Sequence, residues 1–193
     1  MIVLIPLGGL GNRFKNLGYS LPKPLINVMG KPIIFWLLDN LNFKDIEFIY
    51  IPYNQELQKY NFEERIFKNY PNLKFKFYKL TQNTRGAAET ISLSLNQLNI
   101  EDQSILCLDG DNFYLTDIIK LWNNKNRLLV FNDNSQEEVY SYVKTNNNTI
   151  VEIKEKNKIS NLACTGAYGF NSWKQLNIYC KKIKVQIQPY RVR

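Results

Sequence analysis

Histidine is absent from this chain of 193 residues. Without imidazole, the chain's own side chains cannot form a Ser-His-Asp or Cys-His relay, a histidine general base or a histidine-rich zinc site. Any chemistry must therefore rely on carboxylates, lysine, arginine, backbone amides and a hard metal ion. The three cysteines, Cys107, Cys164 and Cys180, form no CxxC pair. They predict buried, reduced thiols in a cytoplasmic protein.

A basic leader and a long apolar run are also lacking. The chain opens directly on a short apolar segment, residues 2–7. We therefore expect no signal peptide, no membrane span and a cytoplasmic location.

Acidic residues are missing from the last part of the chain, since no Asp or Glu follows Glu155. The whole net charge of +8 lies in residues 156–193, whereas residues 1–155 carry 17 residues of each sign. A neutral body without a basic helix or an RNP-like pattern predicts that nucleic acid is not a partner.

Apolar segments alternate with helical patterns through most of the chain. Strands are expected at residues 2–7, 47–52, 75–78, 105–108 and 128–131, and helices at 32–41, 63–70, 87–98 and 116–122. This alternation predicts βαβ units. We expect an α/β protein with a three-layer α/β/α, Rossmann-like fold and a mixed, mostly parallel central sheet.

The later part of the chain has a different pattern. Short strands are expected at residues 142–145, 150–154 and 163–170, followed by a helix that Asn171 would cap and that runs to about residue 182. Residues 185–188 alternate like a further strand. No linker is visible, which predicts a single domain over residues 1–193, with residues 171–193 as a basic helix and tail.

A glycine loop, GGLGNR at residues 8–13, directly follows the first apolar segment. Glycines let backbone N–H groups approach an anion closely, and Arg13 adds forked donors for phosphate oxygens. A dinucleotide fingerprint would need a third glycine where Phe14 stands, and a P-loop would need Ser or Thr where Pro32 stands. A phosphate cradle and a plain tight turn both stay open. Lys23 follows in LPKPL, where two prolines predict an extended segment that adds a second cation.

Together these segments carry a family resemblance. GGLGNR with PKPL resembles the paired signature of sugar-phosphate nucleotidylyltransferases, G-G-x-G-x-R and P-K-P-L. Four later segments also resemble family motifs in the family's order: RGAAET at 85–90, LDGDN at 108–112, IKEK at 153–156 and TGAYGF at 165–170. The segments RGAAET and LDGDN, the latter continuing into Phe113 and Tyr114, are similar to those of the capsule and surface-polysaccharide subgroup. That subgroup includes phosphocholine and phosphoglutamine cytidylyltransferases.

The resemblance implies a Mg²⁺-dependent nucleotidylyltransferase for surface-glycan or capsule precursors. It would join a nucleoside triphosphate, CTP ahead of dTTP or UTP, to a phosphorylated small acceptor and release pyrophosphate. A homodimer is compatible with the family. The implied residues are catalytic Arg13 and Lys23; nucleotide-binding Leu7, Gly8, Gly9, Gly11, Arg13, Gly86 and Ala87; substrate-binding Glu155, Lys156, Thr165 and Gly166; and the metal ligand Asp111, with Asp109 a weaker candidate.

The chain departs from the family at one place. Relatives end with a segment that bears a second metal-binding Asp, and this segment has no counterpart after Glu155. A nucleotide-binding module with impaired catalysis is therefore the alternative. Tyr140, Tyr142 and Tyr168 are expected to be core and rim aromatics rather than ligands.

Overall fold

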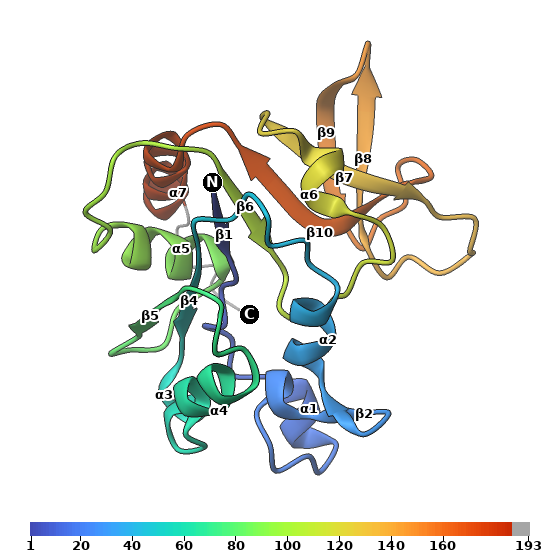
Figure 1. Ribbon diagram of the computed structural model, residues 1–193. Coiled ribbons are helices and arrows are strands. Elements are labelled where there is room, and N and C mark those ends of the chain that lie inside the picture. The colour runs from blue at the N-terminus through green and yellow to red at the C-terminus, as the bar shows by residue number, and fades with distance from the viewer. Residues whose placement is uncertain (187–193) are drawn as a thin grey trace.

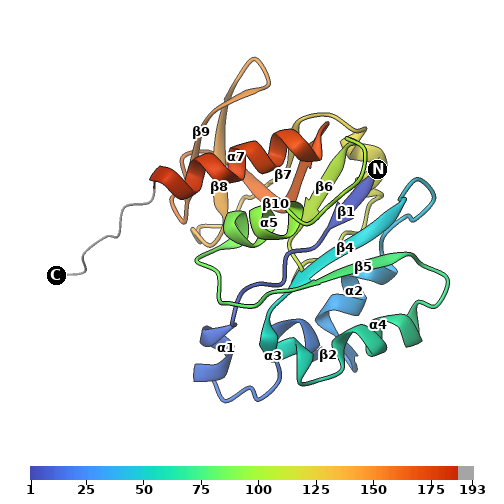
Figure 2. The same ribbon diagram turned by 90° about the vertical axis from the view of Figure 1, so that its left-hand side faces the viewer.

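The computed structural model describes residues 1–186 (Figures 1 and 2). Its centre is an eight-stranded sheet in which β1 lies between β4 and β6. The strands run in the spatial order β5 (Phe75–Lys79), β4 (Phe48–Tyr53), β1 (Ile2–Leu4), β6 (Ile105–Leu108), β10 (Leu162–Phe170), β8 (Ser141–Asn146) and β9 (Thr149–Glu155), and β7 (Arg127–Asn132) also pairs with β10.

The sheet is mixed. Strands β5, β4, β1 and β6 are parallel to one another, and β10 is antiparallel to β6. Strands β7 and β8 pair antiparallel with β10, and β9 pairs antiparallel with β8. The hairpin of β8 and β9 projects from the body of the molecule (Figures 1 and 2).

Helices cover both faces of the sheet, which gives the predicted α/β/α layers. On β1, Val3 packs toward α2 (Ile33–Asp39), α4 (Phe62–Asn69) and α6 (Ile118–Trp122). Ile2 and Leu4 pack on the opposite face, toward α5 (Ala87–Leu95) and α7 (Trp173–Gln186). Side chains alternate along a strand, so a continuous apolar run supplies both cores. Figures 1 and 2 place α5 beside α7.

Short elements connect these layers. Helix α1 (Asn12–Asn16) follows the glycine loop, and a small hairpin of β2 (Asn27–Val28) and β3 (Lys31–Pro32) precedes α2. Helix α3 (Gln55–Gln58) follows β4 directly. The chain enters α6 through Asp117, whose carboxylate accepts a hydrogen bond from the Lys120 backbone N–H at 3.0 Å, as an N-cap residue does.

The expectations for the chain ends need correction. Strand β1 ends at Leu4, and Leu7 forms only an isolated bridge with Tyr53. The cap of α7 is Ser172 rather than Asn171, because the Ser172 hydroxyl accepts the Gln175 N–H at 3.0 Å. Helix α7 continues to Gln186, so residues 185 and 186 are helical rather than extended. Packing against α5 through Leu176 and Cys180 favours the helix over a local alternating pattern. Residues 187 and 188 lie outside the described part.

The segment around Lys23 is also not extended as predicted. It forms the 3₁₀ turn η1 (Lys23–Leu25), in which the Leu25 N–H donates to the Pro22 carbonyl at 2.8 Å. Pro22 itself keeps an extended backbone, but a proline at the second position of η1 can enter a turn because it needs no N–H partner there.

The expectation of buried cysteines agrees with the structure. Cys107, Cys164 and Cys180 are buried and form no disulfide. Among residues 1–186, no helix is long and apolar enough to cross a bilayer.

Candidate active site

The candidate site lies at the edge of the sheet where β1 and β6 end. These strands are parallel neighbours, with Leu4 opposite Cys107. The glycine loop follows β1, and the Asp109–Asp111 turn follows β6, so both loops start side by side. The carboxyl ends of parallel strands are the usual place for ligands in α/β proteins.

The glycine loop approaches the start of α5 closely. A Cβ atom on Gly8 would lie 2.1 Å from Thr90 Oγ1 and 2.8 Å from Thr84 Oγ1, so only glycine fits there. Thr90 Oγ1 donates to the Gly86 carbonyl at 3.3 Å. The predicted nucleotide-binding residues of the two motifs, Gly8 and Gly86, therefore lie in one place.

Asn54 supports the loop, although the sequence analysis did not single it out. Its buried side chain donates to the Gly9 carbonyl at 2.7 Å and accepts the Leu57 N–H at 3.2 Å, which also caps α3. The signal in the sequence was an asparagine directly after an apolar strand, which is typical of a helix cap. That signal carried no information about a loop 45 residues earlier.

Lys23 lies between the glycine loop and the β6 turn. Its ammonium forms an ion pair with the Asp111 carboxylate and lies 5.2 Å from the centre of the Phe14 ring. Gly11, whose φ is +64°, lies against the Lys23 stem. The structure thus brings together the lysine, the glycine loop and the carboxylate that the motifs predicted.

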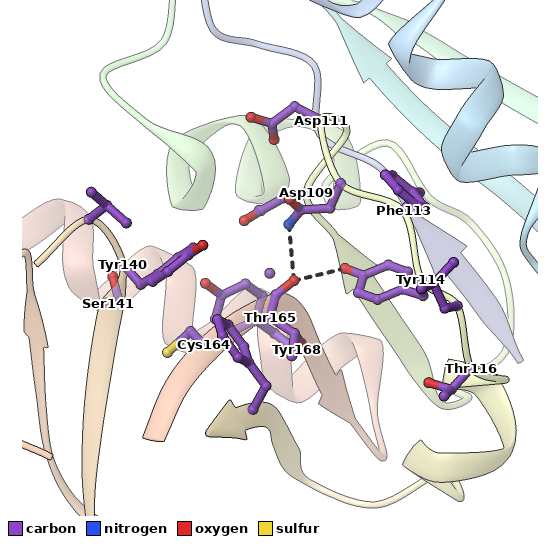
Figure 3. A pocket seen from close by; sticks show the side chains of 15 residues that line it. Asp109, Asp111, Phe113, Tyr114, Thr116, Tyr140, Ser141, Cys164, Thr165 and Tyr168 are labelled. Carbon is purple, nitrogen blue, oxygen red and sulfur yellow. Dashed lines mark hydrogen bonds between the residues drawn. The ribbon is translucent and has the colours of Figure 1, made fainter. Parts of the chain in front are cut away.

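Asp109 is the more buried carboxylate of the turn. Burial and, to a smaller extent, the nearby negative charge of Asp111 raise its pKa, Lys23 opposes both effects, and the net result is a pKa of about 6. The Asp109 backbone N–H donates to the Gly166 carbonyl at 2.9 Å. Its side chain faces the same space as Asp111 (Figure 3).

A bulge in β10 completes this side of the site. The register of β10 against β7 shifts between Cys164 and Tyr168, and Gly166 has a φ of +78°. A Cβ atom on Gly166 would lie 2.3 Å from Asn112 Nδ2 and 2.7 Å from Asp109 Oδ2. A glycine bulge therefore lets the β6 turn approach β10, and such bulges are common beside active sites.

Thr165 fixes the loop after β6 through its backbone. Its carbonyl accepts hydrogen bonds from Asn112 Nδ2 at 3.0 Å and from the Tyr114 hydroxyl at 3.1 Å (Figure 3). The Thr165 hydroxyl donates to the Leu129 carbonyl at 2.9 Å. The TGAYGF motif thus holds the acidic turn, which the sequence alone did not predict.

A cleft of about 720 Å³ opens beside the two acids. Asp109 and Asp111 lie at one side and Tyr140 and Ser141 at the other, with Thr165 between them (Figure 3). The remaining lining residues are mostly aromatic or apolar: Asn112, Phe113, Tyr114, Leu115, Thr116, Phe131, Val139, Cys164, Gly166 and Tyr168. Tyr140 is partly exposed and Tyr142 is fully buried, as expected of rim and core aromatics.

Of the predicted site residues, only Asp109, Asp111, Thr165 and Gly166 line this cleft, and Lys23 and the nucleotide-binding residues lie outside its lining. Arg13 is exposed on α1, and within residues 1–186 its side chain forms no hydrogen bond or ion pair. Glu155 and Lys156 are exposed at the end of β9, where Glu155 pairs with Ser141 and the Lys156 N–H donates to the Tyr140 carbonyl at 2.8 Å. They lie beside the rim rather than in the lining.

The donor set for a metal ion is small. Within the described part of the chain, no group of three or more His, Cys, Asp and Glu side chains gathers to hold a metal. Asp109 and Asp111 are two carboxylates in one turn, which suits a hard cation that keeps several water molecules. Burial and then the negative charge of Asp111 raise the pKa of Asp109, and a divalent cation would relieve the repulsion between the two carboxylates.

Curated relatives match the chain at low identity. The bifunctional protein GlmU of Methanocaldococcus jannaschii is 28% identical over 175 residues, which are 89% of this chain and 40% of that protein. The D-glycero-alpha-D-manno-heptose 1-phosphate guanylyltransferase of Aneurinibacillus thermoaerophilus is 23% identical over 163 residues, 81% of this chain and 68% of that protein. The chain thus spans well under half the length of the GlmU protein.

Solved structures share the fold. A nucleoside-diphosphate-sugar pyrophosphorylase from Vibrio cholerae superposes with a TM-score of 0.78 at 23% identity and covers 97% of this chain and 80% of its own. The inositol-1-phosphate CTP transferase from T. maritima superposes with a TM-score of 0.69 at 15% identity, and the match covers 96% of this chain and 82% of that chain. The predicted α/β fold is confirmed. The family model described as nucleotidyl transferase matches residues 2–187, and the chain belongs to that family.

Proposed function

We propose that this chain is a nucleotidylyltransferase that joins a nucleoside triphosphate to a phosphorylated small acceptor with release of pyrophosphate. The observation that carries the proposal is the convergence of Lys23, the glycine loop and Asp111 at the edge of the sheet, beside the cleft. Family membership supports the same reaction class.

The nucleotide would bind on the side of Gly8 and Gly86. Backbone N–H groups of Gly8, Gly9 and Gly11 would face the triphosphate, Leu7 and Ala87 would border it, and Arg13 would contact the leaving phosphates. Arg13 lies exposed on α1, so its side chain is able to move toward a bound triphosphate. The small residues at Gly86 and Ala87 leave room for a base.

The acceptor would bind in the cleft on the other side of Asp111. Its phosphate oxygen attacks the α-phosphorus, and pyrophosphate leaves. That oxygen is already ionised near neutral pH, so no general base is needed, which suits a chain without histidine. Lys23 would contact the α-phosphate and the incoming phosphate, so catalysis comes from alignment and charge neutralisation. Thr165 and Gly166 line the cleft, whereas Glu155 and Lys156 would contribute from the rim.

A magnesium ion fits the two carboxylates. Asp111 would be its main ligand and Asp109 a second one, which would supply the carboxylate that has no counterpart after Glu155. When bound, the ion would neutralise charge on the phosphates.

A panel of triphosphates and acceptors tests the proposal. CTP, dTTP, UTP and GTP are each combined with phosphocholine, phosphoglutamine, glycerol phosphate and sugar 1-phosphates, and pyrophosphate release is measured with Mg²⁺. We expect turnover with CTP above the others. GTP is included because the curated relatives include a guanylyltransferase. A role in surface-glycan precursors and a cytoplasmic location belong to the same proposal.

A nucleotide-binding module without catalysis is the second candidate. It is the alternative set out in the sequence analysis, and family membership by itself does not distinguish it from the enzyme. Calorimetry that detects triphosphate binding, together with no pyrophosphate release from any pair in the panel, would support this candidate and contradict the enzyme.

A further inference from the structure

One wall of the cleft is formed by the segment that connects β7 to β8. Val139 and Tyr140 of this segment line the cleft together with Ser141, the first residue of β8. Tyr140 and Ser141 lie opposite Asp109 and Asp111 (Figure 3). The Tyr140 ring packs edge-on against Phe131, with 5.1 Å between ring centres. This wall has no regular secondary structure before β8, so something other than a strand ladder must hold it.

A buried carboxylate lies behind this wall. Asp133, directly after β7, is only 5% exposed. Its Oδ1 accepts the Ser135 N–H at 2.9 Å, and its Oδ2 accepts the Tyr142 hydroxyl at 2.8 Å. The same tyrosine hydroxyl lies 2.9 Å from the Glu137 carbonyl. Asp133 thus ties the start of the connecting segment to β8.

Lys158 closes this arrangement from the other side. Its side chain is 16% exposed, and its ammonium donates to the Asp133 carbonyl at 2.9 Å and to the Ser135 carbonyl at 2.5 Å. It also lies 3.4 Å from Asp133 Oδ2. Through these hydrogen bonds and the ion pair, Lys158 connects the residues after β9 to the residues after β7.

A backbone hydrogen bond also holds Tyr140 itself. The Tyr140 carbonyl accepts the Lys156 N–H, two residues before Lys158. The ion pair of Lys158 with Asp133 and the backbone hydrogen bond of Lys156 with Tyr140 therefore both attach the segment after β9 to the segment between β7 and β8. A buried ion pair is seldom a net gain in stability over an apolar pair, but removing one partner leaves the other charge uncompensated.

We propose that Lys158 and Asp133 are positioning residues of the acceptor site, which hold Tyr140 in the wall of the cleft. The proposal rests on the proposed function, in which this cleft receives the acceptor. Within the described residues, neither member of the ion pair forms a hydrogen bond or ion pair with the glycine loop or with Lys23. The ion pair is therefore expected to affect the acceptor and not the nucleotide.

Steady-state kinetics of Lys158→Met test the proposal, with the acceptor that gives the highest turnover in the panel. The KM for the acceptor should rise by about tenfold or more, while the KM for the triphosphate changes less than about twofold. Tyr140→Ala should raise the same KM, and the double variant should show little further increase, since both changes remove one wall. Lys158→Arg should restore part of the affinity.

Lys154→Met is the matched control. Lys154 lies on β9 of the same hairpin and forms an exposed ion pair with Glu152, at 3.5 Å, so its removal should leave all kinetic constants unchanged. If Lys158→Met does not fold, Tyr142→Phe removes only the hydroxyl that bonds Asp133 and serves as the milder variant.

Amide hydrogen exchange provides a readout that needs no activity. Residues 134–141 should exchange faster in Lys158→Met than in the wild type or in Lys154→Met. Faster exchange with an unchanged acceptor KM would overturn the positioning role, and so would unchanged exchange. If the wild type turns over no pair in the panel, the proposed function is wrong and the acceptor role falls with it, while exchange still reports whether Lys158 holds the segment.

Discussion

Lys23 and Asp111, 88 residues apart in the sequence, form an ion pair at the edge of the sheet. Their side chains are 30% and 40% exposed, so the pair is open to ligands. A partly exposed pair of this kind stabilises the fold by only about 1 kcal/mol or less. The two groups can therefore separate at low cost, with Lys23 moving to a phosphate and Asp111 to a cation.

Replacing Lys23 should distinguish the role of Lys23 toward phosphate from the role of Asp111 toward a cation. In Lys23→Ala, turnover should fall by about 10²-fold or more, because a positioned charge on the phosphates is lost. The affinity of the nucleotide-free protein for Mn²⁺ should rise, because the ammonium no longer competes for Asp111. Calorimetry measures the second effect. Lys31→Ala is the matched control, since Lys31 forms a comparable ion pair with Asp39 and should change neither quantity. Undiminished turnover in Lys23→Ala would contradict the role of Lys23.

Gly166→Ala tests the bulge of β10. Its φ of +78° costs an alanine about 1–2 kcal/mol, and the new Cβ would meet Asn112 and Asp109. Gly18 has a similar φ of +87° with no atom within 4 Å, so Gly18→Ala shows the backbone cost alone. Urea unfolding should show a larger loss of stability for Gly166→Ala, and its turnover should also fall. Equal losses in the two variants would mean that contact with the β6 turn is unimportant.

Gly8→Ala tests the contact between the glycine loop and α5. The added Cβ has no room beside Thr90 Oγ1, so the loop must move and triphosphate affinity should fall by about tenfold or more. Thr90→Ala removes the nearest clashing atom, and the double variant should bind better than Gly8→Ala alone. Calorimetry with CTP measures each affinity. An undiminished affinity in Gly8→Ala would show that the loop does not hold the triphosphate.

Asp133 should make stability depend on acidic pH. The Ser135 backbone N–H, the Ser135 side chain and the Tyr142 hydroxyl lower its pKa from 3.8 to about 2, and Lys158 adds to the effect. Because the folded-state pKa is below that of the unfolded chain, the stabilisation is present above about pH 4 and is lost as pH falls toward 2. Asp133→Asn should therefore unfold at lower urea than the wild type at pH 6, and the gap should narrow toward pH 3. A gap that does not depend on pH would contradict this assignment.

The sequence predicted the fold class well, for a physical reason. Apolar runs such as residues 105–108 are buried on both faces of the sheet, and this leaves a strong pattern in one dimension. Strand and helix positions were therefore close to those observed. The ends were less certain: the cap at Ser172 is one side-chain hydrogen bond that a neighbouring polar residue could also make, and the turn at Lys23 is held by two backbone hydrogen bonds that any residue could form.

The sequence by itself determined the chemistry available. It excluded imidazole, and its motifs supplied Lys23, Asp111 and the glycine loop as candidates. The tertiary structure decided which of them meet. Three contacts join residues far apart in the chain: the ion pair of Lys23 with Asp111, the hydrogen bond of Asn54 to Gly9 and the ion pair of Lys158 with Asp133. Such contacts depend on strand order and bulges, and these follow from the packing of the whole sheet rather than from any local pattern.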